Sequence, residues 1–379
     1  MKIYVKKIVF TFFAALLAIS QTCGAKEAVS VTYDHWAKAD SVINASIREG
    51  IIPGAVAVVV DHGKTVYHKA YGNRQIKPET VPMTEDVIFD MASCTKVVVT
   101  TTAILQLYER GIIDLNAPVG KYLREFEGQD ITVTDLLTHT AGFHLENWRV
   151  FDKPLEYVID FLSKPENRAA RGTQYEYSCA NFVLLQQIVE RMTGMRICDY
   201  AKANIFEPLG MNDSHFFPIG EPVAPEIMSR IAAPRESLRK GEVDDHFARL
   251  VLKGNAGNAG LFTTASDMAI FCSALMNGGS NTNGRILKRK TVKKMARMVD
   301  PRFGRALGWD ISCSRKSKLK GHSLSPDSIV HGGYTGTTLA IDLKNKKAII
   351  ILANRIHPED IHYDEWLDKR EIISTYLGE

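Results

Sequence analysis

The spacing in this chain with the clearest chemical meaning is that of Ser93 and Lys96, a serine and a lysine three residues apart. A serine hydroxyl is a weak nucleophile near pH 7, so an enzyme that uses one must hold a proton acceptor against it. Residues three apart in a helix share a face, which would bring the lysine amine to the hydroxyl. The free N–H groups and the dipole of a helix start favour an alkoxide and weaken a lysine's hold on its proton. We therefore predict that Ser93 is a nucleophile and Lys96 its base.

The residues that follow indicate that this pair lies on a buried helix. A Ser-x-x-Lys spacing occurs by chance in most chains of this length, so its context matters. Residues 97–102 are six β-branched residues, which favour a strand by propensity. The apolar pattern nevertheless continues to Gly111, which is too far for an ordinary strand and typical of a helix end. A hydrophobic helix with Ser93 and Lys96 in its first turn is predicted.

The N-terminus has the layout of a secretory signal. Residues 1–7 are basic, 8–19 are almost wholly apolar, and 20–25 are small and polar. The apolar part is too short for a comfortable transmembrane helix. We expect residues 1–25 to be a signal peptide, which leaves a secreted or periplasmic chain without a transmembrane segment. Lipidation of Cys23 is an open alternative, although residues 20–22 make a poor site for it.

Composition is that of an ordinary globular protein. Of the 379 residues, 45% are apolar and 24% charged, which allows a sizeable core. Loss of residues 1–25 removes three lysines and no acid, so the formal charge falls from +4 to +1. This balance gives no reason to expect a nucleic-acid partner.

Cysteine and histidine spacing gives no sign of a metal centre. The number of cysteines after residue 25 is odd, and no two stand at zinc-site or redox-pair spacing. They are Cys94, Cys179, Cys198, Cys272 and Cys313. The histidines are scattered as well. We expect no metal and no cofactor.

Strand signals stand at both ends of the chain and helical signals in the middle. The early part predicts a helix at 36–49 and a hairpin at 54–71. The middle predicts helices at 114–122, 134–138, 154–162 and 182–193. The last part predicts strands near 261–262 and at 306–312, 328–331, 337–342 and 348–354, with helices at 266–276 and 363–376. The simplest arrangement is one antiparallel sheet that pairs the first hairpin with the late strands.

The predicted fold class is therefore α/β of the α+β type, with an antiparallel sheet flanked by helices and an inserted all-helical lobe. Within a catalytic domain of residues 26–379, the α/β lobe would comprise 26–90 and 255–379, and the helical lobe 91–254. A cleft between two such lobes is a common place for a ligand.

The order of six motifs resembles that of the serine β-lactamase and penicillin-binding protein superfamily, in its branch of class C-like esterases, D-aminopeptidases and D,D-peptidases. The motifs are Phe-Asp-Met-Ala-Ser-Cys-Thr-Lys at 89–96, Leu-Leu-Thr-His-Thr-Ala-Gly at 136–142, Gly-Thr-Gln-Tyr-Glu-Tyr-Ser-Cys at 172–179, Gly-Asn-Ala-Gly-Leu-Phe-Thr-Thr-Ala at 257–265, Leu-Gly-Trp at 307–309 and His-Gly-Gly-Tyr-Thr-Gly at 331–336. The resemblance spans about residues 33–356 and implies a β-lactamase/transpeptidase-like fold.

The resemblance implies a role for each motif. Ser93 would be the acylated nucleophile and Lys96 its base. Tyr177 stands in the family's Tyr-x-Asn motif, where its phenol would share a proton with Lys96 or Ser93. Without that match, an aromatic ring packed on the core is the simpler reading of Tyr177. His139, in the segment at 136–142, is expected to be structural. We call the segments at 89–96, 172–179 and 331–336 the first, second and third motifs.

The last motif would complete an oxyanion hole. The backbone N–H of Tyr334 would face that of Ser93, and two such donors stabilise the developing negative charge. Gly332 and Gly333 would let the strand edge approach the substrate closely, although a Gly-Gly pair in a strand can also mark only a bulge.

Two residues depart from the family pattern in the part of the site that would bind substrate. Cys179 stands where the family usually has an asparagine, and a thiol cannot donate and accept as an amide does. His331 stands where β-lactamases have a lysine, and a histidine is only partly charged at pH 7. We therefore expect weak β-lactam turnover or none.

The sequence thus predicts an exported serine hydrolase that acts through a Ser93 acyl-enzyme on an ester or on a D-amino-acid-containing amide or peptide. Its partners would be small-molecule esters, peptides or peptidoglycan fragments. The alternative is a non-catalytic penicillin-binding-like protein that binds peptidoglycan or a partner protein, and Cys179 keeps it open. A plain α/β-hydrolase is disfavoured, because the chain lacks a Gly-x-Ser-x-Gly segment.

Overall fold

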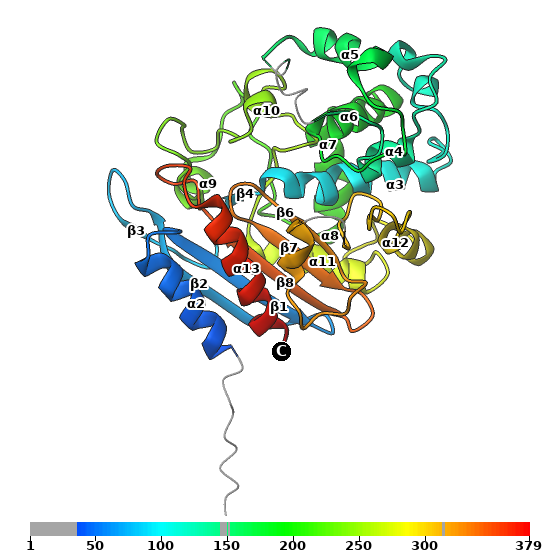
Figure 1. The fold of residues 1–379 in the computed structure, drawn as a ribbon. Coiled ribbons are helices and arrows are strands. Elements are labelled where there is room, and N and C mark those ends of the chain that lie inside the picture. Colours follow the sequence, from blue (N-terminus) through cyan, green and yellow to red (C-terminus); the bar gives the residue numbers. More distant parts are fainter. Residues whose placement is uncertain (1–35, 145–149, 151, 313–314) are drawn as a thin grey trace, which may run out of the picture. The chain divides into compact units, whose positions relative to one another are not determined.

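A six-stranded antiparallel sheet forms the centre of the computed structural model, which describes residues 36–144, 150, 152–312 and 315–379 (Figure 1). The predicted signal peptide, Cys23 and Cys313 lie outside the described residues. The strands follow the order β3 (Val81–Pro82), β2 (Lys64–Gln75), β1 (Gly54–Asp61), β8 (Lys347–Ala353), β7 (Thr338–Asp342) and β6 (Ile329–Gly332).

The sheet joins the two ends of the chain, as the sequence predicted. β1 pairs with β2 in the first hairpin and with β8 on its other side, where Val58 lies opposite Ile350. β1 and β8 are almost wholly buried, which explains why their sequences are continuous apolar runs rather than alternating apolar and polar residues.

Helices cover both faces of the sheet. On one face α2 (Ala37–Arg48) and α13 (Tyr363–Gly378) lie side by side (Figure 1), and on the other lies α11 (Ala265–Met276). Alternate β1 residues point to opposite faces. Val59 accordingly belongs to the core cluster beneath α13, and Val58 to the larger cluster that contains α11.

The middle of the chain is mostly helical, and the predicted fold class is confirmed. Its helices are α3 (Thr102–Glu109), α4 (Val133–Thr138), α5 (Leu155–Ser163), α6 (Cys179–Thr193), α7 (Ile197–Ala201), α8 (Glu207–Leu209), α9 (Pro225–Arg230) and α10 (His246–Leu250), and α12 (Arg289–Ala296) follows α11. A short ladder of β4 (Phe89–Asp90) and β5 (Phe262–Thr263) leads into the Ser93 segment. Within the described ranges, none of the helices combines the length and hydropathy that a bilayer crossing requires.

The helix predicted at 114–122 is wrong. Only a short 3₁₀ turn forms there, at Val119–Lys121. Pro118 before it is extended, with ψ of 142°, and cannot donate a helical hydrogen bond. The chain is further held by close packing at Gly120, where an added Cβ would lie 2.4 Å from the carbonyl oxygen of Phe126.

The strand predicted at 306–312 is also wrong. Asp310 makes an isolated bridge to Val330, but no continuous ladder forms. Gly308 interrupts the segment with φ of +78°, and an added Cβ there would lie 2.1 Å from Thr101 Oγ1. The apolar pattern of this segment therefore reflects packing against the Ser93 helix rather than strand pairing.

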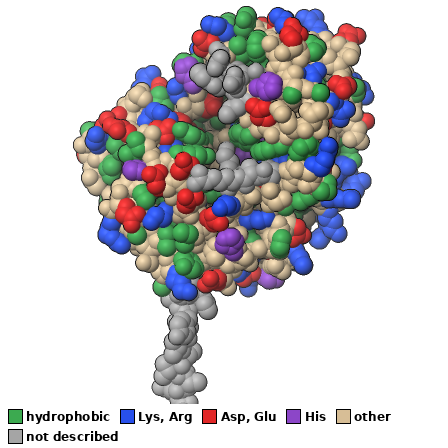
Figure 2. Space-filling view, in the orientation of Figure 1, with side chains coloured by type: hydrophobic (Ala, Val, Ile, Leu, Met, Phe, Trp, Pro, Cys, Tyr) green, Lys and Arg blue, Asp and Glu red, His purple; other side chains and the backbone are tan. Residues whose placement is uncertain are grey.

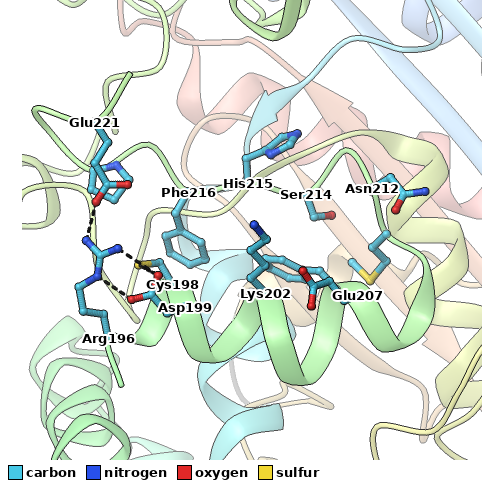
Figure 3. A pocket seen from close by; sticks show the side chains of 13 residues that line it. Arg196, Cys198, Asp199, Lys202, Glu207, Asn212, Ser214, His215, Phe216 and Glu221 are labelled. Atoms are coloured by element: carbon cyan, nitrogen blue, oxygen red, sulfur yellow. Dashed lines mark hydrogen bonds and ion pairs between the residues drawn. The ribbon is translucent and has the colours of Figure 1, made fainter. Parts of the chain in front are cut away.

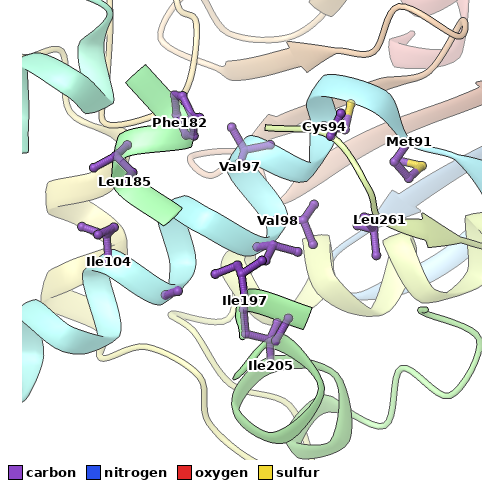
Figure 4. Packing of buried hydrophobic residues seen from close by; sticks show 14 of the residues in the cluster. Met91, Cys94, Val97, Val98, Ile104, Phe182, Leu185, Ile197, Ile205 and Leu261 are labelled. Atoms are coloured by element: carbon purple, nitrogen blue, oxygen red, sulfur yellow. The ribbon is translucent and has the colours of Figure 1, made fainter. Parts of the chain in front are cut away.

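The helix predicted after Ser93 is present, although it is not uniformly α-helical. A 3₁₀ turn at Ala92–Cys94 leads into a π-helical stretch at Lys96–Thr101 and then into α3. Figure 4 shows apolar side chains of this stretch, such as Val97 and Val98, among those of other helices. Burial on all sides explains why six β-branched residues form a helix here against their propensity.

Candidate active site

Ser93 and Lys96 are in direct contact. The Lys96 Nζ donates a hydrogen bond to Ser93 Oγ at 3.0 Å. Lys96 is fully buried, whereas Ser93 is partly exposed. The structure thus places an accessible hydroxyl against an amine that water does not reach.

Lys96 has two further acceptors. Its Nζ donates to the carbonyl oxygen of Asn258 at 2.8 Å and lies 3.5 Å from Cys179 Sγ. Burial by itself lowers the pKa of Lys96, but Cys179 and Tyr177 outweigh this, so the pKa is raised above its usual range. The expectation that Lys96 holds its proton weakly is therefore wrong. The acceptors around the ammonium stabilise its charged form, so the start of the helix does not by itself determine the pKa of Lys96.

The glycine-rich loop at 254–260 delivers the Asn258 carbonyl. Thr100 Oγ1 donates to the carbonyl of Gly257 at 2.6 Å, and Thr95 Oγ1 accepts from the N–H of Gly260 at 3.1 Å. An added Cβ on Gly257 would lie only 2.6 Å from Thr100 Oγ1. The glycine therefore permits the close approach that brings the carbonyl to Lys96.

Tyr177 lies beside the same amine. The centre of its ring is 5.3 Å from Lys96 Nζ, and the nearby Tyr177 contributes to the raised pKa of Lys96. The centre of the His331 ring lies 6.3 Å from the centre of the Tyr177 ring. Tyr177 therefore joins the second motif to the first and faces the third, so the packed-aromatic reading does not describe its whole environment.

His139 holds the Tyr177 segment in place. It is buried and ends α4 in a left-handed conformation with φ of 58°. Its Nδ1 accepts from the backbone N–H of Ser178 at 3.3 Å and contacts Asn181 Nδ2 at 3.1 Å. Its ring centre is 4.6 Å from that of Tyr177. These contacts agree with a structural role.

The third motif lies at the end of β6, directly against the Ser93 segment. An added Cβ on Gly333 would lie 2.5 Å from the carbonyl oxygen of Met91, so this approach requires glycine. On Gly332 it would meet Leu319 at 2.5 Å. His331 is buried, and its Nδ1 lies 3.1 Å from the Gly332 carbonyl oxygen. The two glycines thus allow the end of β6 to pack closely against Met91 on one side and against Leu319 on the other.

The sequence model of the β-lactamase family matches residues 39–372. The chain belongs to the β-lactamase family. The resemblance of its motifs is thereby confirmed. The structure brings the segments that carry Ser93, Tyr177 and Gly333 to one place.

Known proteins related to this β-lactamase family member have hydrolytic names. It is 29% identical to the N-acetylmuramyl-L-alanine amidase of Bacillus subtilis (strain 168), over 86% of this chain and 82% of that protein. It is 29% identical to a putative D-alanyl-D-alanine carboxypeptidase of Salmonella typhi, over 77% and 74%. The solved structure of EstCE1, a hydrolase with promiscuous acyltransferase activity, superposes with a TM-score of 0.69 at 18% identity, over 90% of this chain and 98% of that one. This last likeness shows the shared fold.

Two threonines that the sequence did not single out join the third motif to the first. Thr335 Oγ1 donates to the carbonyl oxygen of Asp90 at 2.7 Å, and Thr337 Oγ1 donates to that of Met91 at 3.2 Å. Both threonines are buried. They fix the distance between the Ser93 segment and the turn that carries Tyr334. No spacing rule predicts them, because their acceptors are backbone atoms about 245 residues away.

The Asp90 side chain holds the residue before the nucleophile. Its Oδ1 accepts from the Ala92 N–H at 2.8 Å, and its Oδ2 accepts from the Asp244 N–H at 2.9 Å. Ala92 has φ of 44°, a costly conformation for a residue with a side chain. Burial raises the pKa of Asp90 to about 7. This carboxylate thus stabilises the strained turn that presents Ser93.

Tyr334 is fixed through its carbonyl and its ring. The buried Arg355 donates to the Tyr334 carbonyl oxygen at 2.8 Å and to Asp360 at 2.7 Å. The Tyr334 hydroxyl donates to the other oxygen of Asp360 at 2.8 Å, and the ring stacks on Tyr363. The half-exposed ring is therefore a rigid surface beside the site rather than a free side chain.

A cavity of about 430 Å³ lies elsewhere, between α7 and the segment 211–221 (Figure 3). Arg196 in its wall is paired with Asp199 at 2.7 Å and with Glu221 at 2.5 Å. Burial raises the pKa of the Cys198 thiol to about 12, which keeps that thiol protonated. The cavity holds no activated nucleophile, so the Ser93 region remains the candidate site despite the size of this hollow.

Thr335→Val should lower kcat about tenfold or more while KM changes little. The substitution keeps the side-chain volume but removes the hydroxyl that joins the third motif to Asp90, and small misplacements at an active site cost about this much. Steady-state kinetics on a soluble ester would measure it. Thr335→Ser should restore activity.

Thr291→Val provides the matched control for that change. Thr291 is buried, and its hydroxyl has no hydrogen-bond partner among the described residues. Its substitution should leave kcat unchanged. Equal effects of the two valine variants would show that Thr335 has no positioning role.

Proposed function

We propose that this protein is an exported serine hydrolase that forms an acyl-enzyme on Ser93 and acts on an ester or on a D-amino-acid-containing amide or peptide. The observation that carries the proposal is the 3.0 Å contact between Ser93 Oγ and the buried Lys96 Nζ. Membership of the β-lactamase family and the hydrolytic names of the relatives support it.

Acylation begins when Ser93 Oγ attacks the carbonyl carbon of the substrate. The hydroxyl proton passes to Lys96 Nζ, which must first be neutral, and the backbone N–H groups of Ser93 and Tyr334 stabilise the oxyanion. As the tetrahedral intermediate collapses, the proton moves through Lys96 and Tyr177 to the leaving alkoxide or amine. The products of this step are the free alcohol or amine and the Ser93 ester.

Deacylation repeats these steps with water. Lys96, with Tyr177, accepts a proton from a water molecule as its oxygen attacks the Ser93 ester. Collapse of the second intermediate returns the proton to Ser93 Oγ and releases the carboxylic acid. The Asn258 carbonyl keeps the amine aimed at Ser93 in both halves of the cycle.

The substrate class follows from the groups around Ser93. Cys179 and His331 offer neither the amide nor the permanent cation that grip an acylamino carboxylate in a β-lactamase, and this favours neutral esters. The amidase and carboxypeptidase relatives act, by their names, on cell-wall amides, and this favours peptidoglycan fragments. A panel of esters, D-amino-acid amides and muropeptides would decide between the two.

Ser93→Ala should abolish hydrolysis of p-nitrophenyl acetate and labelling by a fluorophosphonate probe, because both require the Ser93 hydroxyl. Ser273→Ala, at another partly buried serine on α11, should leave both unchanged. Retained activity in Ser93→Ala would place the nucleophile elsewhere. An unlabelled parent protein would instead favour the non-catalytic binder.

Activity should increase with pH over the neutral range. The base is neutral Lys96, and because the pKa of Lys96 is raised, the protonated form dominates at pH 7. The reactive fraction then grows about tenfold per pH unit between roughly pH 6 and 9. The measurement is kcat/KM for an ester, corrected for spontaneous hydrolysis. A flat profile would contradict the assignment of Lys96 as the base.

Cys179→Asn should increase turnover of nitrocefin relative to that of the ester. The amide restores a donor and an acceptor for the acylamino group, and one neutral hydrogen bond is worth about 1 kcal/mol, or roughly fivefold. Nitrocefin and p-nitrophenyl acetate kinetics on the same preparation give the ratio. Rapid, Ser93-dependent nitrocefin hydrolysis by the parent would refute the expectation of weak β-lactam turnover.

A further inference from the structure

The segment 285–297, which contains α12, carries an unusual concentration of positive charge. Seven of its thirteen residues are lysine or arginine and none is acidic. These seven, which we call the basic face, are Arg285, Lys288, Arg289, Lys290, Lys293, Lys294 and Arg297, and all of them are exposed. Figure 2 shows lysine and arginine side chains gathered at the right of the molecule, where α12 lies in Figure 1.

The positive charge of this segment is not a property of the chain as a whole. The whole sequence has a formal net charge of +4, so the residues outside 285–297 sum to −3. The basic face therefore belongs to a protein whose remaining residues are, in sum, slightly negative. Such an asymmetry orients a molecule towards an anionic surface.

The core fixes the direction in which the cations point. Thr291, Val292 and Met295 are the buried residues of α12, and the helix packs through them towards α3. Lysines on the other side of the helix must then face solvent. The packing of α12 therefore fixes the orientation of the basic face.

The cations of the basic face have no acidic partner in the described part of the chain. Among the described residues, none of the seven forms an ion pair, whereas the nearby Asp300 is engaged by Arg302. The Glu109 carboxylate contacts only the backbone N–H of Lys288, at 2.6 Å. Like charges three and four residues apart oppose helix formation. An anionic partner would therefore relieve repulsion that the fold tolerates.

We propose that the basic face binds the surface of a membrane rich in anionic phospholipid. A row of exposed cations along one helix matches an extended surface of phosphate groups better than a single small anion. Single-stranded nucleic acid fits less well, because residues 285–297 contain no aromatic side chain for base stacking. Binding is electrostatic, since the apolar residues of α12 are already used in the core.

Vesicle co-sedimentation tests the proposal. The parent protein should bind vesicles of phosphatidylcholine with one-third phosphatidylglycerol and not vesicles of phosphatidylcholine alone. Binding should weaken as ionic strength rises from about 0.01 to 0.15 M, because the screening length falls from about 30 to 8 Å. All variants share one N-terminus, so any contribution of residues 1–35 is common to them.

The decisive comparison is between two triple variants of equal charge. Lys290→Gln with Lys293→Gln and Lys294→Gln should lower binding to the anionic vesicles roughly 100-fold, at about fivefold per cation. Lys64→Gln with Lys202→Gln and Lys344→Gln, at exposed lysines outside the basic face, should lower it only severalfold. Both should keep the parent's thermal unfolding and ester hydrolysis.

Three outcomes would overturn the proposal. They are equal losses in the two triple variants, equal binding to neutral and anionic vesicles, and binding of a soluble polyanion such as heparin or DNA without binding of anionic vesicles. The vesicle measurement needs no catalysis, so it stands or falls independently of the proposed hydrolase function.

Discussion

The structure depends most on the need to satisfy a buried lysine. A charged amine removed from water is very costly unless acceptors surround it. Lys96 meets this need with Ser93 Oγ, the Asn258 carbonyl and Cys179 Sγ, which come from three distant parts of the chain. The same contacts that make the burial tolerable aim the amine at the nucleophile. Stability and chemistry are therefore coupled at this one nitrogen.

The elements around this amine can be understood as its supports. The π-helical turn at Lys96–Thr101 and the close approach of Gly257 bring the Asn258 carbonyl within hydrogen-bonding distance of the Lys96 amine. On the other side, Thr335 and Thr337 join the end of β6 to the carbonyls just before Ser93. Such contacts between side-chain hydroxyls and backbone carbonyls tolerate changes in the surrounding side chains.

The two residues that depart from the family's motifs, Cys179 and His331, lie beside Lys96 and Tyr177. Cys179 contacts Lys96, and His331 is buried in β6. Because Cys179 contributes to the raised pKa of Lys96, a change at this position would also affect the proposed base. The basic face is a third, independent feature: it shares no residue with the site and depends only on how α12 packs.

The sequence by itself determined the sheet that joins both ends of the chain, the helix after Ser93 and the family, because these rest on local apolar patterns and on motifs with fixed order. It failed at 114–122 and 306–312, where Gly120 and Gly308 pack tightly against distant atoms that no local pattern reveals. It likewise placed Lys96 beside Ser93 but misjudged how firmly the amine holds its proton. Only the tertiary structure decided that, because the acceptors around Lys96 come from residues 83 and 162 positions away in the chain.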